Sequence, residues 1–448
     1  MAFAIRSGDE ALQVQMVCLD ELVPGDDDLR RIERLVNWPA VRAAAAAFYV
    51  TGGPGRPALD PVVLVKLALV LAWRGGDSMR ELLRTSRTDL SVRLFLGFGL
   101  TEALPHHSTF SHAQCRRFAQ SSVFEQLFTS VLRQCTDAGL VGGRRLLVDA
   151  THVEADAALK SLRAELAVID GDGEGGGEDA GAAELAVIDG MGEGEDAGAA
   201  ARAKLEVAAP RSGPTPKRIA SNATAVSRTD SDAKLRHKPG HRKHLVHRAQ
   251  VAADPEHRVI VAVEAEPATG SEADVLGVLV GRARFAGHTV GALGADSGYA
   301  SADSYERLAG LGVVAYIPPM PNAKHQAAQD ARARVRTPVG VAVKIERTVH
   351  AEGAIAELKR HGLWRARSRG TRKLQLQLLA AATAINLKRL LAHQDAQDAY
   401  VNRSDAAHQR QPATTAIRLL IAGRMLVLLN ATLDEISRLA TTDTSTAS

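Results

Sequence analysis

Three acidic residues stand where a carboxylate could do chemistry. Asp149 directly follows the apolar run 146–148, Asp296 closes a second apolar run that begins at residue 290, and Glu352 belongs to a helical pattern over residues 349–359. A carboxylate at the end of a buried strand is costly unless a partner or a metal ion meets it. If the three converge, they predict a site for two divalent ions, Mg²⁺ or Mn²⁺, of the kind that cleaves or transfers phosphodiesters.

The acids near Glu352 need separate interpretations. A lone aspartate more often caps a turn than binds metal, so only the conjunction of three acids favours a site. Glu352 and Lys359 are seven residues apart and share one helix face, two turns apart. Glu357 lies about 140° round the helix from Glu352, which favours an ordinary surface ion there. Glu346 is expected to precede the helix.

Two side chains beside the aspartates have two possible roles each. His152 is either a further ligand or phosphate contact, or a hydrogen-bonded bystander. Tyr299 either orients Asp296 or contacts a phosphate. The sequence alone does not choose between these roles.

The elements that must position the acids follow the pattern of an α/β domain with a mixed sheet. Apolar runs predict strands at 144–150, 290–296 and 313–318, and a hairpin whose strands, 243–253 and 257–267, flank the turn ADPE. Helices are expected at 272–286, 302–310 and 374–391. If the first and fourth strands lie side by side, Asp149 and Asp296 meet at one end of the sheet.

Residues 1–140 are predicted to be mostly helical. The clearest start signal is Pro61 at the first helical position after Asp60. Several short helices of this kind form either a DNA-binding module or a dimerisation domain, and spacing does not distinguish the two.

Charge is distributed unevenly along the 448 residues, although the net charge is only +4. Residues 211–250 hold ten Lys/Arg and residues 359–394 hold nine, which favours a polyanionic partner, with solvated faces as the alternative. Trp364 either stacks on an unpaired base or packs in the core. The predicted DNA-binding residues are Lys359, Arg360, Arg365, Arg367, Arg369, Arg372 and Lys373.

A low-complexity segment at 163–200 interrupts the α/β domain, within an insertion at about 155–240. The sequence ELAVIDG occurs at 165–171 and again at 184–190, and residues 161–200 hold eleven acids against one base. Gly171, Gly173 and Gly176 satisfy GxGxxG, but the acids around them would repel a pyrophosphate. We interpret the segment as a duplicated acidic linker.

Cysteine use and hydropathy indicate a cytoplasmic protein. The three cysteines, Cys18, Cys115 and Cys135, are far apart, so neither a disulfide framework nor a zinc site is expected. The N-terminus has no apolar signal core, and Lys66 interrupts the longest apolar run, so no membrane span is expected.

Several stretches resemble the bacterial insertion-sequence transposases that have a DDE catalytic core. The resemblance covers about residues 20–395 apart from the insertion, and its pieces run in family order: DPVVLVKLALVLAWRGGDSMRELLRTS with LPHHSTFSHAQCRRF, LLVDATHVEA, the strand region 227–267, GADSGYASADSYERLAGLGVVAYIPP and RTVHAEGAIAELKRHGLWRARSRGTRK. The resemblance implies an RNase H-like mixed five-stranded sheet with flanking helices, preceded by an all-helical domain. It also implies a helical DNA-binding or dimerisation domain at 1–140, a catalytic domain at 141–395 and a helical tail at 396–448.

The resemblance assigns roles to individual residues. Asp149, Asp296 and Glu352 take the catalytic, metal-binding roles, and Lys359 resembles the family's DNA-contacting lysine. The implied function is metal-dependent strand cleavage and strand transfer at the ends of an insertion sequence. The implied partners are terminal inverted repeats, target DNA and a second copy of the chain, or more, in a nucleoid-associated complex.

Two features depart from the family pattern. Relatives place an arginine four residues before the glutamate, where this chain has Thr348 beside Arg347, and the segment 320–344 is expected to be short and irregular. Two rival functions also fit the sequence. One is a non-catalytic DNA-binding protein, such as a decayed transposase or repressor, and the other is a metal-dependent nuclease that does not join strands.

Overall fold

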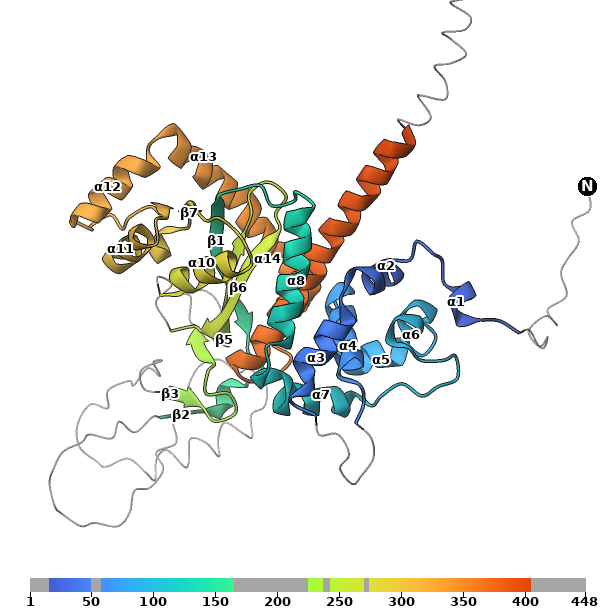
Figure 1. The fold of residues 1–448 in the computed structure, drawn as a ribbon. Helices are drawn as coiled ribbons and strands as arrows, with labels where there is room; N and C mark the ends of the chain where they lie inside the picture. Colours follow the sequence, from blue (N-terminus) through green and yellow to red (C-terminus); the bar gives the residue numbers. More distant parts are fainter. Residues whose placement is uncertain (1–15, 50–57, 165–224, 237–241, 270–273, 404–448) are drawn as a thin grey trace, which may run out of the picture. The chain divides into compact units, whose positions relative to one another are not determined.

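The computed structural model describes residues 16–49, 58–164, 225–236, 242–269 and 274–403 (Figure 1). Met1–Arg389 form one compact unit and Leu390–Ser448 a second. Nearly all of the acidic segment 163–200, and residues 404–448 of the predicted tail, lie outside the described residues. The boundaries predicted near residues 140 and 395 stay predictions.

The N-terminal part is helical, as the sequence predicts. The best-defined helix is α4 (Pro61–Trp73), where the Asp60 side chain accepts a hydrogen bond from the Val62 N–H at 2.9 Å. Ten of its residues are buried, so it is the core helix of this part. The other helices are α1 (Leu19–Leu22), α2 (Asp28–Leu35), α3 (Trp38–Ala46), α5 (Met79–Thr85), α6 (Leu90–Leu96), α7 (His107–Arg116), η2 (Phe118–Gln120) and α8 (Val123–Asp137).

A mixed sheet follows, with an antiparallel half and a parallel half. Its central strand, β1 (Arg145–Glu154), pairs antiparallel with β5 (His244–Ala253), which pairs antiparallel with β6 (Ile260–Pro267). On its other side β1 pairs parallel with β7 (Ala292–Gly294), and β7 pairs parallel with β8 (Val314–Tyr316). These five strands, numbered one to five along the chain, are arranged in the order 3-2-1-4-5.

The prediction of five strands is wrong by one in the described part of the chain, which has a six-stranded sheet. The extra strand, β4 (Lys234–Arg236), pairs with the start of β5, next to where β6 ends. Its three residues contain a single apolar side chain, so it has no strand pattern of its own. A separate small sheet joins β2 (Leu162–Ala164) to β3 (Ala225–Ser227).

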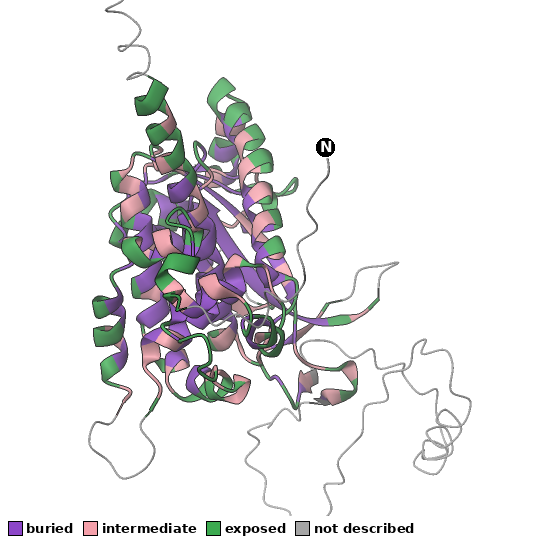
Figure 2. Ribbon diagram, turned by 90° about the vertical axis from the view of Figure 1, so that its right-hand side faces the viewer, coloured by how far each residue is buried: buried purple, intermediate pink, exposed green. Residues whose placement is uncertain are grey.

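Helices cover the sheet and bury its strands (Figure 2). Helix α10 (Val275–Phe285) packs on β6. The predicted apolar helix is present, since residues 371–389 are helical. Its Asn386 side chain accepts from the Ile260 N–H at 2.9 Å and donates to the Ile260 carbonyl at 2.8 Å, which fixes this helix on β6.

The region after β8 differs from the prediction of an irregular segment. Besides α11 (Ala302–Gly310), which matches its predicted bounds, two helices form, α12 (Gln326–Val335) and α13 (Pro338–Glu346). The side chains of His325 and Thr337 cap them, and Pro338 occupies the first turn of α13. Glu346 therefore ends α13 and, as predicted, precedes the helix at residues 352–358 that carries Glu352.

Helix α13 continues without a break into the segment that carries Glu352. Two π-helical turns, η5 (Arg347–Ala351) and η6 (Lys359–Leu363), flank α14 (Glu352–Leu358). This helical run contacts β1 and β5. Within the part of the chain that the structure describes, none of the helices combines the length and apolar character that a membrane span requires.

Candidate active site

The three predicted acids line one cavity of about 650 Å³ at the end of the β1–β7 pairing. Its walls come from β1, the residues after β7, and the helical run from η5 to η6. The lining residues are Asp149, Ala150, Asp296, Arg347, Glu352, Ile355, Ala356, Lys359, Arg360 and Trp364.

The pairing register explains why the two aspartates meet. Leu147 of β1 lies beside Gly294 of β7, and the two strands run in the same direction. Asp149 and Asp296 each come two residues later, so the chain brings both to the same edge. The expectation that the first and fourth strands lie side by side is confirmed. However, β1 continues to Glu154 along β5, so Asp149 stands within a strand and not at its end.

Asp149 is the most constrained of the three acids. The Ala150 N–H donates to its Oδ1 at 2.8 Å, and Arg347 Nη1 lies 3.2 Å from its Oδ2. Burial raises the pKa of Asp149, and the charges of Asp296 and Glu352 raise it further, against the Ala150 hydrogen bond and Arg347, which lower it. The acids therefore repel one another, and Arg347 compensates for only part of this charge.

Asp296 is held by a turn that depends on Tyr299. Its Oδ1 accepts from the Gly298 N–H at 2.9 Å, so it caps the 3₁₀ turn η4 (Ser297–Tyr299). Tyr299 is fully buried and donates its hydroxyl proton to the Gln250 side chain. Of the two roles left open for Tyr299, support of the Asp296 turn agrees with its burial, and contact with a phosphate does not.

The π-helical turn η5 brings Arg347, and not the residue at position 348, to face the acids. In an α-helix, residues five apart point about 140° away from each other. A π-turn closes on the fifth residue, and both Arg347 and Glu352 line the cavity. The neighbouring Thr348 instead donates to the Lys344 carbonyl at 3.2 Å. Spacing rules for an α-helix do not reveal this arrangement, and nothing in the sequence signals the extra residue.

Lys359 lines the same cavity as Glu352, as their shared helix face predicts. Its Nζ lies 4.7 Å from the centre of the Trp364 ring. Burial lowers the pKa of Lys359, and the nearby Arg236 lowers it further. The Trp364 side chain is 64% exposed, which excludes the core role that the sequence left open. Glu357 faces elsewhere and pairs with Arg389 at 2.6 Å.

Of the six predicted DNA-binding residues that follow Lys359, four are exposed, one is half-buried and one points inward. Arg360 and Arg372 are exposed, and Arg365 and Arg369 lie 3.5 and 3.7 Å from Asp156 at the surface. Lys373 is half-buried, and its Nζ lies 3.6 Å from Cys115 Sγ.

Arg367 is the inward member. It donates through Nη2 to the Gly76 carbonyl at 2.6 Å, and burial lowers its pKa to about 10.

His152 is surrounded by cationic side chains. Burial lowers its pKa to about 4, together with Arg236, Arg248 and Lys359. It is therefore neutral at pH 7, and it is absent from the lining of the cavity. The position fits the bystander role more closely than the ligand role.

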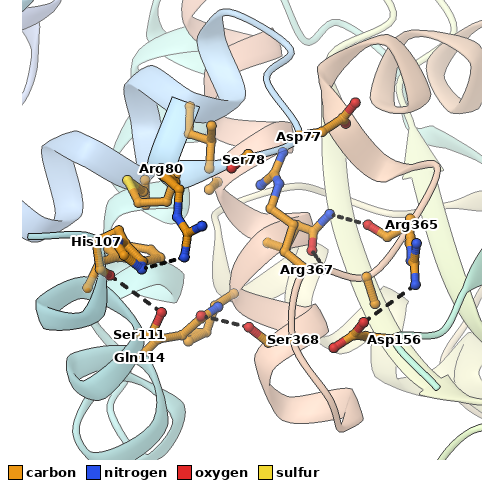
Figure 3. Close-up of a pocket in the computed structure, with 18 of the residues that line it drawn as sticks. Asp77, Ser78, Arg80, His107, Ser111, Gln114, Asp156, Arg365, Arg367 and Ser368 are labelled. Carbon is orange, nitrogen blue, oxygen red and sulfur yellow. Dashed lines mark hydrogen bonds and ion pairs between the residues drawn. The ribbon is translucent and has the colours of Figure 1, made fainter. Parts of the chain in front are cut away.

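A second cavity, of about 640 Å³, was not foreseen from the sequence (Figure 3). It lies between the N-terminal helices α4, α5 and α7 and residues 364–368, and Trp364 lines both cavities. Figure 3 shows Arg367 reaching from the later segment toward the one that carries Asp77 and Ser78, while Arg80 points at His107, 3.1 Å from its Nε2.

The donor set can be tested for its fit to a divalent ion. Carboxylate oxygens are the ligands that Mg²⁺ prefers, and three carboxylates with mutual repulsion face one cavity. Among the residues that the structure describes, no three His, Cys, Asp or Glu side chains are grouped closely enough to hold an ion as they stand. The chemistry of the donors fits, and their side chains must turn toward one another to bind an ion.

Comparison with known proteins gives two family matches. Residues 17–116 match the family described as Transposase domain (DUF772), and residues 211–387 match the family described as Transposase DDE domain. Asp296 and Glu352 lie inside the second match, and Asp149 precedes it. No solved structure matches the chain. The chain thus matches a transposase domain over its N-terminal helices and a transposase DDE domain over the later strands and helices of its sheet, which is consistent with an insertion-sequence DDE transposase.

Proposed function

We propose that this transposase cuts DNA at the ends of its element and joins the freed 3′ ends to target DNA, using Asp149, Asp296 and Glu352. One observation carries the proposal. Three carboxylates from a strand, a turn and a helix line one cavity, together with Lys359 and Arg360. A site that combines clustered acids with adjacent cations suits a metal-dependent reaction at a phosphodiester.

The three acids would hold Mg²⁺ or Mn²⁺, with two ions as the expected number. When bound, such ions supply positive charge that activates the attacking oxygen and stabilises the leaving one. Arg347 favours the ionised form of Asp149 and orients its carboxylate before that charge arrives, because it lies 3.2 Å from Asp149 Oδ2. Lys359 and Arg360 bind the phosphates on either side of the bond that breaks.

The DNA backbone would run past the exposed cations beyond the cavity. Arg365 and Arg369 are held at the surface by Asp156, a counterion that a phosphate can replace. Their contacts would fix the register of the DNA without reading its sequence, and they would weaken with salt. Arg367 does not belong to this surface, because its guanidinium is turned toward Gly76.

The experiment is a cleavage and joining assay on labelled DNA that carries the ends of the element, with Mg²⁺ or Mn²⁺. We expect cleavage and joined products from the wild type and neither from Asp149→Asn, Asp296→Asn or Glu352→Gln. The control is Asp303→Asn, on the first turn of α11 and outside the lining of the cavity. Salt-sensitive DNA binding without cleavage would favour a non-catalytic DNA-binding protein, and cleavage without joining would favour a nuclease.

Two ends must be brought together before they are joined, so we also propose that at least two copies of the chain act on one element. Analytical ultracentrifugation with and without end DNA tests this. A complex that holds one copy of the chain per two ends would contradict it.

A further inference from the structure

The C-terminal end of α4 is capped by side chains from the far end of the chain. His361 Nδ1 donates to the Ala72 carbonyl at 2.7 Å, and Lys388 Nζ donates to the Trp73 carbonyl at 3.1 Å. Arg367 Nη2 donates to the carbonyl of Gly76, just beyond the helix, at 2.6 Å. The last carbonyls of a helix lack i+4 partners and carry partial negative charge, so donors and cations stabilise them. The Ala72 carbonyl also accepts from the Gly75 N–H at 3.0 Å.

The two backbones also meet closely at this junction, and two glycines permit the contact. Gly75 has φ +64°, and a Cβ there would lie 2.2 Å from the Arg360 carbonyl oxygen. Gly362 has φ +87°, and a Cβ there would lie 2.1 Å from Arg367 Nη2 and 3.1 Å from the Gly76 carbonyl oxygen. A side chain at Gly75 would therefore push the two backbones apart, and one at Gly362 would displace the Arg367 guanidinium from this junction.

The protonation of His361 follows from its partners. Because the Ala72 carbonyl can only accept, Nδ1 carries the proton, and Nε2 faces Lys388 Nζ at 3.5 Å as an acceptor. Burial lowers the pKa of His361, so it remains neutral beside the ammonium group. Lys388 Nζ also lies 4.8 Å from the centre of the Trp73 ring, which gives the cation a second partner on α4.

The segment held at this junction is the one that reaches into the candidate active site. Lys359 and Arg360 line the cavity, the helical geometry breaks at His361 and Gly362, and Trp364 follows at the rim. Beyond the break, the Glu154 N–H donates to the Trp364 carbonyl at 3.1 Å. The segment is therefore held by α14 on one side, by β1 on the other, and by α4 at the bend between them.

We infer that His361, Lys388 and Arg367 are positioning residues, which use the end of α4 to set Lys359 and Trp364 beside the three acids. The effect on the reaction rests on the proposed function above. Through this junction, the placement of cations in the active site depends on the N-terminal helices. DNA bound by those helices and the phosphodiester that reacts are therefore both positioned by α4.

A double-mutant cycle separates positioning from general stability. Lys388→Met and His361→Ala are each made in the wild type and in a Lys359→Ala background, and single-turnover cleavage of end DNA is measured. We expect each to lower the rate about tenfold in the wild type, as for a misplaced contact, and to cause little further loss without Lys359. His361→Asn, whose amide can still donate, should recover most of the rate.

The matched control is Arg42→Met. Arg42 lies on α3, and its Nη2 is 2.6 Å from Oδ2 of Asp60, which caps the N-terminal end of α4. It should leave the cleavage rate unchanged. Equal losses for Lys388→Met in both backgrounds would overturn the inference, because the residue would then act independently of Lys359. Lys388 is half-buried, so its variant keeps the test open if His361→Ala, at a buried position, fails to fold.

A second measurement does not depend on catalysis. Backbone hydrogen exchange of the full chain, read by mass spectrometry, should be about tenfold faster over residues 359–366 in Lys388→Met and His361→Ala than in the wild type or Arg42→Met. Unchanged exchange there would overturn the inference even in an active enzyme. If the wild type cleaved no DNA, the proposed function would fail, and the exchange result would still decide whether α4 holds this segment.

Discussion

Replacing Arg347 with methionine should expose the repulsion among the three acids. Arg347 Nη1 lies 3.2 Å from Asp149 Oδ2, and the two side chains are only 17% and 15% exposed. At an effective dielectric constant near 20, that separation corresponds to a gross attraction of about 5 kcal/mol. Competition with water at the mouth of the cavity reduces the net effect to about 1–2 kcal/mol.

The sign of the effect follows from the raised pKa of Asp149. A carboxyl whose pKa is higher in the folded protein than in the unfolded chain favours folding at low pH, and this contribution is lost as pH rises through the folded pKa. Arg347→Met raises the pKa of Asp149 further, so more stability is lost at neutral pH. Below the ordinary aspartate range, near pH 4, both proteins hold a protonated Asp149 and should converge.

The assay is thermal unfolding of the full chain from pH 4.5 to pH 8 without divalent ions. We expect Arg347→Met to melt about 2–4 °C below the wild type at pH 7.5, with a gap that closes toward pH 4.5 and also narrows on addition of Mn²⁺. The control is Arg145→Met, on the same strand as Asp149, which breaks the 3.1 Å pair with Glu346 at a position outside the cavity lining. A pH-independent gap, or one equal to that of Arg145→Met, would refute the reasoning.

Three further predictions follow from contacts elsewhere in the fold. Asp230→Ala should lower the free energy of unfolding by about 3 kcal/mol, because Asp230 lies 3.0 Å from His247 Nε2 with both side chains buried; chemical denaturation measures it. Burial raises the pKa of Asp230, but the His247 and Gly370 hydrogen bonds outweigh it, so the pKa is lowered. This stability is therefore present at neutral pH and lost as pH falls through the acid range. Asn386→Ala should cost about 2 kcal/mol in the same assay, since it leaves both backbone groups of Ile260 without this partner. Arg365→Ala should reduce the slope of log affinity for DNA against log salt by about one, whereas an unchanged slope would remove Arg365 from the DNA surface.

Local patterns predicted much of the fold. Apolar runs at 243–253 and 257–267 around the turn ADPE predicted the β5–β6 hairpin, and the helix expected at 302–310 is α11. The meeting of Asp149 and Asp296 was also predictable, because it needs only that two apolar strands pair in parallel. These features depend on neighbours in the sequence or on a single pairing.

Features that depend on distant contacts were not predictable. The charged and polar residues at 149 and 152 concealed the continuation of β1 to Glu154, where pairing with β5 sustains the strand. The comparison with the family pattern suggested a short, irregular segment at 320–344, although the His325 and Thr337 caps start two helices there. The direction of Arg367 is set by a carbonyl 291 residues earlier in the chain, and no local pattern distinguishes it from its exposed neighbours.

The most direct test of the account is a Mn²⁺ titration of the full chain followed by electron paramagnetic resonance, with bound ions counted in the wild type, Asp149→Asn and Glu352→Gln. The account predicts two bound ions in the wild type and an affinity at least tenfold weaker in each variant, with Asp303→Asn unchanged. Binding of equal strength and number in all four proteins would show that the three acids do not hold the metal, and the proposed site would be wrong.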